Sequence, residues 1–303
     1  MVGFFMISVV MATFNGEKYL SQQLDSLFYQ SFIPAEIIVV DDCSTDGTWD
    51  ILCEYATKYH QIKLYHNNIN LGVVKTFERG LSLCSRDYIA LADQDDVWLP
   101  NKLEILIATL GNNWLIHSDA YVVDEQLNII NESYSSIKPY HDGSLEMYYF
   151  RNDVTGCTAL LKRELLKIAL PFPDDTIMHD YYLALYARAY NKLIYTNHKL
   201  VKYRQHINNV IGSGAMPSYE LMLSTFNKQI RFLNSLSKQP EFYCKQMEIP
   251  KSYFLSIISC KLPKLSTILF VYKKLGGAAT VSMIFYTAIN KRFAKFYFSL
   301  THR

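Results

Sequence analysis

The segment that decides the fold is Ile37-Ile38-Val39-Val40-Asp41-Asp42-Cys43-Ser44-Thr45-Asp46-Gly47-Thr48-Trp49. Four β-branched apolar residues come first, and a polar stretch rich in Asp, Ser and Thr follows. A short apolar run of this kind favours a buried β-strand, and the polar residues after it favour the start of a helix. Apolar residues then recur at helical spacing from Ile51 to Tyr59. The segment therefore predicts a strand, a polar turn and a helix.

The same order of strand and helix repeats through the first 100 residues. Strands are predicted at Phe5–Met11, Ile37–Val40, Ile62–Tyr65 and Tyr88–Ala92, with helical patterns at Glu17–Ser31, Ile51–Tyr59 and Val74–Cys84. Short apolar strands separated by helices predict an α/β fold. Its central sheet should be mostly parallel, with helices on both faces and right-handed crossovers.

The pattern changes after about residue 114. Short strands are predicted at Trp114–His117, Tyr121–Val123, Cys157–Leu161, Leu193–Tyr195 and Leu200–Tyr203, and a helix at Asp180–Tyr190. Residues 216–303 are predicted to be helical, with three prolines breaking the run. We therefore expect a domain at 1–215, with a nucleotide-binding half at 1–113 and an acceptor-binding half at 114–215. A C-terminal helical region should follow at 216–303.

Composition excludes several classes of protein. Half of the 303 residues are hydrophobic and 19% are charged, which excludes a disordered chain and supplies a sizeable core. The net charge of +2 does not suggest a nucleic-acid binder. The six cysteines form no CxxC pair, so a zinc or redox motif is not expected, and scattered thiols favour the cytosolic face. No secretory signal or membrane span is predicted.

Asp93-Gln94-Asp95-Asp96 follows the fourth predicted strand. Asp93 and Asp95 are two residues apart, so in extended backbone their side chains should point the same way. No basic residue stands between them, and the two carboxylates should repel unless a cation holds them. Mg²⁺ or Mn²⁺ would suit such oxygen ligands. The alternative is a solvated acidic loop.

Two further acidic sites each allow two interpretations. Asp41 follows the second strand, where its carboxylate could accept the ring N–H of uracil or thymine, while Asp42 or Ser44 caps the next helix. Asp180 stands at the predicted start of a helix. It is either a helix-stabilising acid or a general base, and local sequence does not separate the two.

Arg204 and His206 come after a short predicted strand. Arg204 could bind a phosphate with two hydrogen bonds, and His206 could give a neutral nitrogen to a metal. A single histidine is more often structural, so both interpretations stay open.

These motifs, in this order, resemble the family 2 glycosyltransferases over residues 5–212. The resemblance rests on residues 8–15 and 39–48, on Asn70-Leu71-Gly72, and on the acidic motif at 93–96. It implies the GT-A fold, which is Rossmann-like. The second half resembles bacterial rhamnosyltransferases of O-antigen or capsule synthesis. That likeness rests on His117-Ser118-Asp119, residues 154–158, His179-Asp180 and residues 203–206.

The resemblance implies a role for each matching residue. It implies that Thr13 and Asn15 line the nucleotide pocket, Asp41 binds the base, Asp93 lies on the ribose side, Asp95 is the main metal ligand, Asp180 is the catalytic base, and His206 helps to hold the metal and diphosphate. From its phosphate chemistry, we also expect Arg204 to bind the nucleotide-sugar donor. Many family members have Glu-Asp at the base motif, whereas here His179 precedes Asp180, so the role of position 179 is open.

The resemblance also implies a reaction. A metal-dependent, inverting transfer would move a sugar from a nucleoside diphosphate donor, with dTDP-rhamnose expected first. UDP-glucose, UDP-galactose and UDP-GlcNAc are the alternatives. The acceptor would be a hydroxyl of a growing, lipid-linked surface polysaccharide. A non-catalytic scaffold is the alternative from another class. A nucleotidyltransferase is disfavoured, because Thr13-Phe14-Asn15-Gly16 lacks its glycine-rich, basic loop.

The C-terminal region differs in charge from the rest of the chain. Residues 251–303 hold nine Lys or Arg and no acid, while the other 250 residues hold 21 basic and 28 acidic residues, a net charge of −7. Bulky apolar residues stand among these cations. The pattern favours a basic amphipathic surface that lies peripherally on the cytoplasmic face of a bacterial inner membrane. The alternative is a pair of core-covering helices.

Overall fold

The computed structural model describes residues 6–138, 140, 145–150, 152–206, 219–239, 242 and 250–252. The chain divides into two compact units. The first comprises Met1–His141, Asp153–Phe172 and Met178–Ser213, and the second comprises Asp142–Asn152, Pro173–Ile177 and Gly214–Arg303. Every predicted site residue belongs to the first unit.

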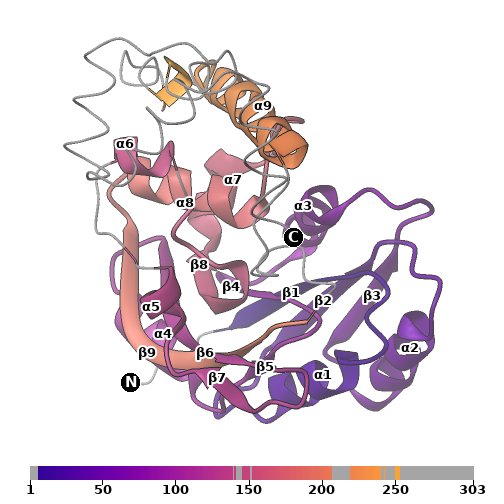
Figure 1. The fold of residues 1–303 in the computed structure, drawn as a ribbon. Coiled ribbons are helices and arrows are strands. Elements are labelled where there is room, and N and C mark those ends of the chain that lie inside the picture. The colour runs from indigo at the N-terminus through magenta and orange to yellow at the C-terminus, as the bar shows by residue number, and fades with distance from the viewer. Residues whose placement is uncertain are drawn as a thin grey trace. The chain divides into compact units, whose positions relative to one another are not determined.

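Four parallel strands form one side of the sheet in the first unit (Figure 1). They are β1 (Ile7–Thr13), β2 (Glu36–Asp41), β3 (Ile62–His66) and β4 (Tyr88–Ala92), in the spatial order β3-β2-β1-β4. All residues of β2 are buried, as expected for a β-branched run covered on both faces. The four strands predicted from the apolar runs are therefore confirmed, and three of them end one or two residues later than expected.

The other side of the sheet is mixed. β8 (Ala159–Lys162) is antiparallel to β4 and to β6 (Leu115–Val123), and β6 is parallel to β9 (Leu193–Arg204). The short strand β5 (Val97–Trp98) is antiparallel to β9 at the end of the strand order, and β7 (Ile129–Asn131) is antiparallel to β6. Two pairs of predicted short strands are thus single long strands. Register shifts between β6 and β9 interrupt the alternation of buried and exposed side chains. In the sequence, such an interruption looks like a gap between two short strands.

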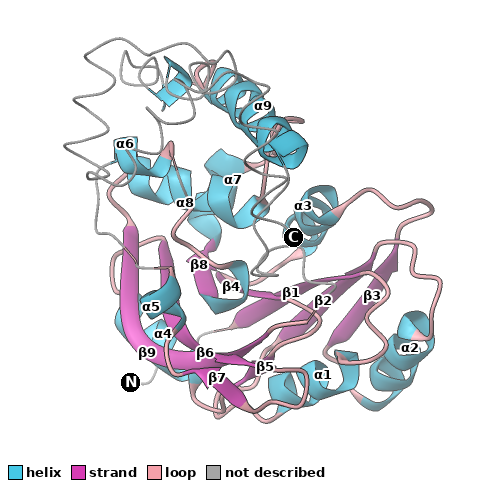
Figure 2. Cartoon of the chain, viewed as in Figure 1, coloured by secondary structure: helices cyan, strands magenta, loops and turns pink. Residues whose placement is uncertain are grey.

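Helices cover both faces of the parallel strands (Figure 2). Leucines of α1 (Leu20–Phe28), α2 (Thr48–Lys58) and α4 (Lys102–Leu110) pack in one core with the odd-numbered residues of β1. α3 (Val73–Leu83) covers the other face, where a Cβ at Gly80 would lie 2.5 Å from a Val10 methyl carbon. That contact allows only glycine, and it holds α3 close to the sheet.

The remaining elements of the first unit are short. They are α5 (Tyr134–Ile137), the 3₁₀ turn η1 (Gly156–Thr158), α7 (Arg163–Ala169) and α8 (His179–Ala189). The second unit contains α6 (Leu145–Tyr148) and α9 (Tyr219–Leu236), with a core around Tyr149 and Phe232. Within the described residues, the structure has no helix of the length and apolar character needed to span a bilayer. The membrane surface was predicted for residues 251–303, of which 253–303 lie outside the described residues.

Candidate active site

The carboxyl ends of the parallel strands meet at one edge of the sheet. In the register of β1, β2 and β3, Thr13 pairs with Asp41 and Asp41 pairs with His66. β4 ends at Ala92, beside Met11, so the acidic motif lies beyond the same edge. Residues predicted to bind a nucleotide and residues predicted to hold a metal therefore come from one side of one sheet, where α/β proteins place their ligands.

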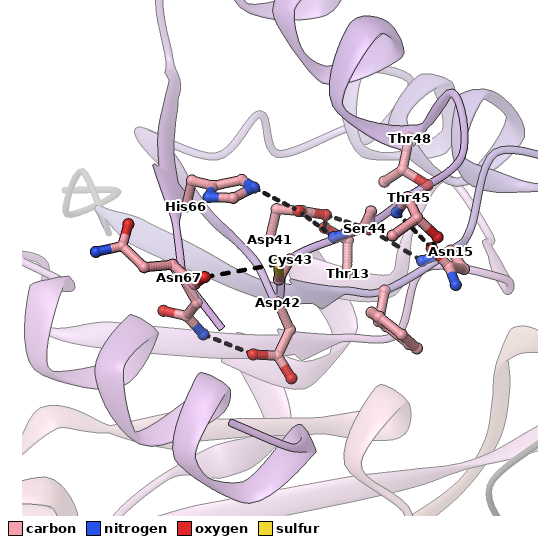
Figure 3. A network of polar contacts seen from close by, with 12 residues as sticks. Thr13, Asn15, Asp41, Asp42, Cys43, Ser44, Thr45, Thr48, His66 and Asn67 are labelled. Atoms are coloured by element: carbon pink, nitrogen blue, oxygen red, sulfur yellow. Dashed lines mark hydrogen bonds and ion pairs between the residues drawn. The ribbon is translucent and has the colours of Figure 1, made fainter. Parts of the chain in front are cut away.

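Asp41 lies at the centre of a polar network at this edge (Figure 3). The hydroxyl groups of Thr13 and Ser44 donate to its Oδ1 at 2.8 and 2.6 Å, and the Ser44 amide donates to its Oδ2 at 2.9 Å. His66 Nε2 lies 3.5 Å from the same Oδ2. Asp41 has no solvent-exposed surface, so its carboxylate is fixed by protein donors before any ligand arrives.

Asn15 joins the loop after β1 to the loop after β2. Its backbone N–H donates to Ser44 Oγ at 2.9 Å, and its Oδ1 accepts the Thr45 amide at 2.8 Å. Its φ of 49° is in the left-handed region, which asparagine tolerates better than most residues. Thr13 and Asn15 thus lie beside Asp41 as predicted for a shared pocket, and their binding roles stay predictions.

Asp42 has a structural function instead. Its carboxylate accepts the Asn67 side-chain amide at 2.7 Å and the backbone amides of Leu71 and Gly72 at 2.8 Å each. These bonds hold the loop that precedes α3. We had expected Asp42 or Ser44 to cap the next helix in the chain. In the structure, Asp46 bonds the Thr48 amide at the start of α2, while Asp42 organises the start of α3.

The acidic motif bends at residues 94 and 95. The bend corrects the expectation that Asp93 and Asp95 point the same way, because that expectation assumed extended backbone. Asp93 lies with Asp96 and Cys157, whose candidate ligand atoms are all within 4.8 Å of one another. Asp95 instead pairs with His206, at 2.9 Å between Oδ2 and Nε2. The bend therefore sorts the carboxylates into two groups.

The Gln94 side chain bonds this bend to the loop that follows β1. Its side-chain amide accepts from the Phe14 N–H at 2.9 Å and donates to the Phe14 carbonyl at 3.0 Å. A Cβ at Gly16 would lie 2.3 Å from Gln94 Oε1, so the pairing requires glycine there. The acidic motif is thus attached to the loop that carries Asn15.

Lys102 supplies a cation that the sequence did not reveal. It is fully buried, donates to the Cys157 carbonyl oxygen and lies over the Trp98 ring at 3.2 Å from its centroid. Burial lowers its pKa to about 7, and Asp96 and Asp93 act against that shift. The carboxylates therefore have a basic neighbour, Lys102, which is the first residue of α4 and lies six positions after Asp96.

The Asp93, Asp96 and Cys157 group includes a thiol, which is a softer ligand than Mg²⁺ or Mn²⁺ prefers. Burial, with the neighbouring acids, raises the pKa of Asp93 and of Asp96. Burial also raises the pKa of the Cys157 thiol. Asp95 and His206 fit better, because they offer a carboxylate and an imidazole whose side chains keep 18% and 8% of their surface exposed.

Arg204 is bonded to the protein through its side chain and its backbone. It is fully buried, and its Nε donates to the Asp95 carbonyl at 2.7 Å while its guanidinium also bonds the Glu125 carbonyl and the Gln22 side chain. Its backbone N–H donates to Asp96 Oδ1 at 3.0 Å. Arg204 thus holds the acidic motif in place through its bonds to Asp95 and Asp96. Its predicted contact with the donor phosphate stays a prediction.

Asp180 lies in the first turn of α8, where its carboxylate accepts two backbone amides. The Gly156 N–H donates to Oδ2 at 2.9 Å, and the Tyr181 N–H donates to Oδ1 at 2.6 Å. Asp180 is close enough to Asp93 for its charge to contribute to the raised pKa of Asp93. The predicted base thus lies close to Asp93, although the two are 87 positions apart in the sequence.

Sequence reasoning missed three residues that shape this site: Gln94, Lys102 and Gly156. Gln94 stood inside the acidic motif, but nothing local indicated that its amide folds back on β1. Lys102 could have been suspected from helical spacing, since it begins an apolar helix directly after the motif. Gly156 appeared only as part of a family motif. The close packing that requires glycine there depends on α8, which is distant in sequence.

The comparisons with known proteins agree with this geometry. The family model described as "Glycosyl transferase family 2" matches residues 8–168. The dTDP-rhamnosyl transferase RfbG of Shigella flexneri is 31% identical over 220 residues, which cover 67% of this chain and 74% of the relative.

A second relative has a different substrate in its name. The UDP-Glc:alpha-D-GlcNAc-diphosphoundecaprenol beta-1,3-glucosyltransferase WfgD of Escherichia coli is 30% identical over 184 residues, which cover 60% of this chain and 69% of the relative. Among solved structures, residues 1–349 of S. aureus TarS in complex with UDP-GlcNAc superpose with a TM-score of 0.61 at 19% identity. That match covers 99% of this chain and 93% of the other, and it shows the fold alone.

Proposed function

Since the chain belongs to glycosyl transferase family 2 and has the GT-A fold, we propose that it transfers rhamnose from dTDP-rhamnose to a hydroxyl of a growing, lipid-linked bacterial surface polysaccharide. The chain is a glycosyltransferase of the nucleotide-sugar type in polysaccharide synthesis. The sugar, the acceptor and the stereochemistry are the proposed part. The observation that carries the proposed donor site is that Asp41 and the acidic motif follow parallel strands at one edge of the sheet, with Asp180 close to Asp93.

The nucleotide half would bind the donor through residues already held in place. Asp41 would accept the N3–H of a thymine or uracil ring, because its carboxylate is oriented by Thr13 and Ser44. Asn15 would line the same pocket, since it joins the two loops beside Asp41. Fixed acceptors cost less to organise at binding than mobile ones.

Asp95 and His206 would hold a divalent cation in this scheme. The carboxylate suits Mg²⁺ or Mn²⁺, and the imidazole beside it favours Mn²⁺, because Mg²⁺ is the stricter oxygen binder. A bound cation would offset the charge that develops on the departing diphosphate. Arg204 holds the backbone of this pair in place, because its Nε donates to the Asp95 carbonyl.

Asp180 would act as the general base. Its two backbone donors fix the carboxylate at the α8 N-terminus, from which it would accept the proton of the acceptor hydroxyl. The hydroxyl oxygen then forms a bond to the anomeric carbon as the bond to the diphosphate breaks. Attack from the face opposite the diphosphate inverts that carbon.

The names of the relatives support rhamnose first and glucose second. The first relative carries rhamnosyl transfer in its name and covers more of this chain than the glucosyltransferase. A panel of dTDP-rhamnose, UDP-glucose, UDP-galactose and UDP-GlcNAc, each with Mn²⁺, would test the donor by release of the nucleoside diphosphate. We expect the fastest release with dTDP-rhamnose. Faster release from a UDP-sugar would replace the donor assignment.

A thermal shift separates the enzyme from a non-catalytic scaffold. Mn²⁺ and dTDP together should raise the melting temperature if the chain has a donor site, since a ligand that binds only the folded state stabilises it. A chain that responds to neither ligand and releases no diphosphate would contradict the proposal.

We also propose that the basic C-terminal region lies peripherally on the cytoplasmic face of the bacterial inner membrane. Its cluster of nine cations without an acid supports this, and a lipid-linked acceptor would be found there. Removal of the residues after Lys264, followed by cell fractionation, would test it. Unchanged recovery in the membrane fraction would contradict the proposal.

A further inference from the structure

His179 is a buried histidine directly before Asp180. Only 2% of its surface is exposed, and neither ring nitrogen has a hydrogen-bond partner among the described residues. Leaving a buried polar group unpaired costs about 1–3 kcal/mol. Within the described part of the chain, the His179 ring therefore contributes to this structure through packing and not through hydrogen bonds.

Two residues that are distant in sequence, Phe77 and Gly156, contact the His179 ring. The ring stacks on Phe77 with centroids 3.7 Å apart and planes 15° from parallel. It also lies against Gly156, where a Cβ would be 3.2 Å from Nε2 and 3.6 Å from Asp180 Oδ2. The glycine lets the histidine ring and the backbone approach each other.

Both neighbours connect His179 to groups that matter in the proposed reaction. Gly156 is the residue whose N–H donates to Asp180 Oδ2. Phe77 belongs to α3, whose start is bonded to Asp42 through the Gly72 amide. The Phe77 ring therefore links the base helix α8 to the helix that the nucleotide-half loops hold in place.

We propose that His179 is a positioning residue for Asp180: its ring, held between Phe77 and Gly156, fixes the carboxylate relative to the nucleotide half. This inference rests on the proposed role of Asp180 as the base. His179 acts by the shape of its ring rather than by charge. Burial lowers its pKa to about 4, so the ring is neutral at neutral pH.

The chain offers a matched control in His117. This histidine of β6 is also 2% exposed, its Nε2 has no hydrogen-bond partner among the described residues, and its ring packs against Tyr140 and Tyr195. His117→Ala and His179→Ala should therefore destabilise the protein to a similar degree. If kcat differs between the two variants, the cause would be the position of the His179 ring beside Asp180 and not a loss of stability.

Three variants test the proposal at a temperature where each is folded by circular dichroism. With the best donor of the panel, His179→Ala should lower kcat about 10- to 100-fold at unchanged affinity for dTDP, since a 1 Å displacement of a reacting group has an effect of that size. His117→Ala should keep kcat within about threefold. His179→Phe should restore most of kcat, because phenylalanine preserves the stack on Phe77.

Hydrogen exchange gives a readout that needs no activity. The Gly156 amide should exchange at least about tenfold faster in His179→Ala than in His117→Ala, and His179→Phe should restore its protection. Equal Gly156 exchange in the two alanine variants would overturn the inference even if the enzyme assay works. A His179→Phe variant as slow as His179→Ala would also overturn it, because the nitrogens would then matter. If the wild-type chain were inactive, the proposed function would be contradicted. The hydrogen-exchange result would still decide whether His179 positions Asp180.

Discussion

Asp95 Oδ2 and His206 Nε2 lie 2.9 Å apart, although 111 residues separate them in the chain. The pairing of β5 with β9 brings them together, because Val97 and Trp98 pair with Lys202 and Val201. The Tyr19 ring covers His206, with centroids 5.0 Å apart. An acid at the end of one strand and a histidine beyond another thus form one polar pair at the edge of the sheet.

Replacement of either member of this pair should weaken Mn²⁺ binding. Loss of groups that merely support a metal ligand costs about 10- to 100-fold in affinity, so Asp95→Asn or His206→Gln should cost at least that. Calorimetric titration with Mn²⁺ in the presence of dTDP measures it. Glu54→Gln removes an exposed acid of α2 and serves as the control. Unchanged Mn²⁺ affinity in both site variants would place the metal elsewhere.

Asp180→Asn should reduce kcat while leaving donor binding intact. The amide keeps the shape and can still accept the Gly156 N–H, but it cannot take a proton from the acceptor. A positioned general base contributes about 10²- to 10⁴-fold, and a loss of that size is expected. Steady-state diphosphate release and dTDP titration measure the two effects separately. Near-native turnover would show that another group is the base.

Lys102→Met should destabilise the fold by about 3–5 kcal/mol, because it leaves buried acids without their cation. The double variant Lys102→Met/Asp96→Asn removes one charge of each sign and should recover part of that loss. Urea denaturation of the two single variants and the double variant measures the coupling. Strictly additive free energies would mean that Lys102 and Asp96 do not interact.

Glu36 should make the protein lose stability in acid. Burial raises the pKa of Glu36, but hydrogen bonds from Lys63, Ser8 and Ser85 outweigh burial and lower it to about 2. Because the folded-state pKa is below the unfolded value of 4.5, the stabilisation is present above pH 4.5 and fades as the pH falls toward 2.

Glu36→Gln tests that contribution. Lys63 is half-exposed, so we expect only on the order of 2 kcal/mol to depend on this charge. The variant should be less stable than the wild type at pH 7, and most of this difference should be lost by pH 2.5, as measured by urea denaturation. A constant difference between the two proteins across this range would rule out the charge as the cause.

Cys43→Gly should stabilise the loop after β2. Cys43 has a φ of 66°, a left-handed conformation that costs a residue with a Cβ about 1–2 kcal/mol. Glycine relieves this strain but loses more entropy on folding, so a net gain of about 0.5–1 kcal/mol is expected. Cys53→Gly, at an exposed helical position of α2, should show the opposite sign. A loss of stability in both variants would contradict the strain argument.

The sequence predicted the first half of the fold well because its signals are local. Apolar runs of four to seven residues mark β1 to β4, and the polar residues at their ends are adjacent in the chain to the strands that carry them. β6 and β9 were each predicted as two short strands. Their register shifts depend on each other, and neither segment shows this alone.

A site residue could be predicted only where its own sequence motif was enough to suggest its role. Asp95 was evident from its motif, and His206 was chosen through a resemblance. The expectation that Asp93 and Asp95 point the same way was wrong, because the backbone is bent at residues 94 and 95, where the Gln94 side chain bonds the backbone of Phe14. Lys102 was missed because its charge acts across space, between a helix and a 3₁₀ turn 55 residues apart in the chain.

The long separation between β5 and β9 sets the order in which a ribosome can complete this protein. A nascent chain that has emerged as far as α4 already carries the acidic motif, but it lacks the β9 partner of Val97 and the histidine beside Asp95. Until β9 emerges, Trp98 and its neighbours lack the strand that covers them, and such unpaired edges invite misassembly during synthesis. The pair of Asp95 and His206 is therefore among the last parts of the first unit to form, and stalled chains that end before residue 200 should require chaperones.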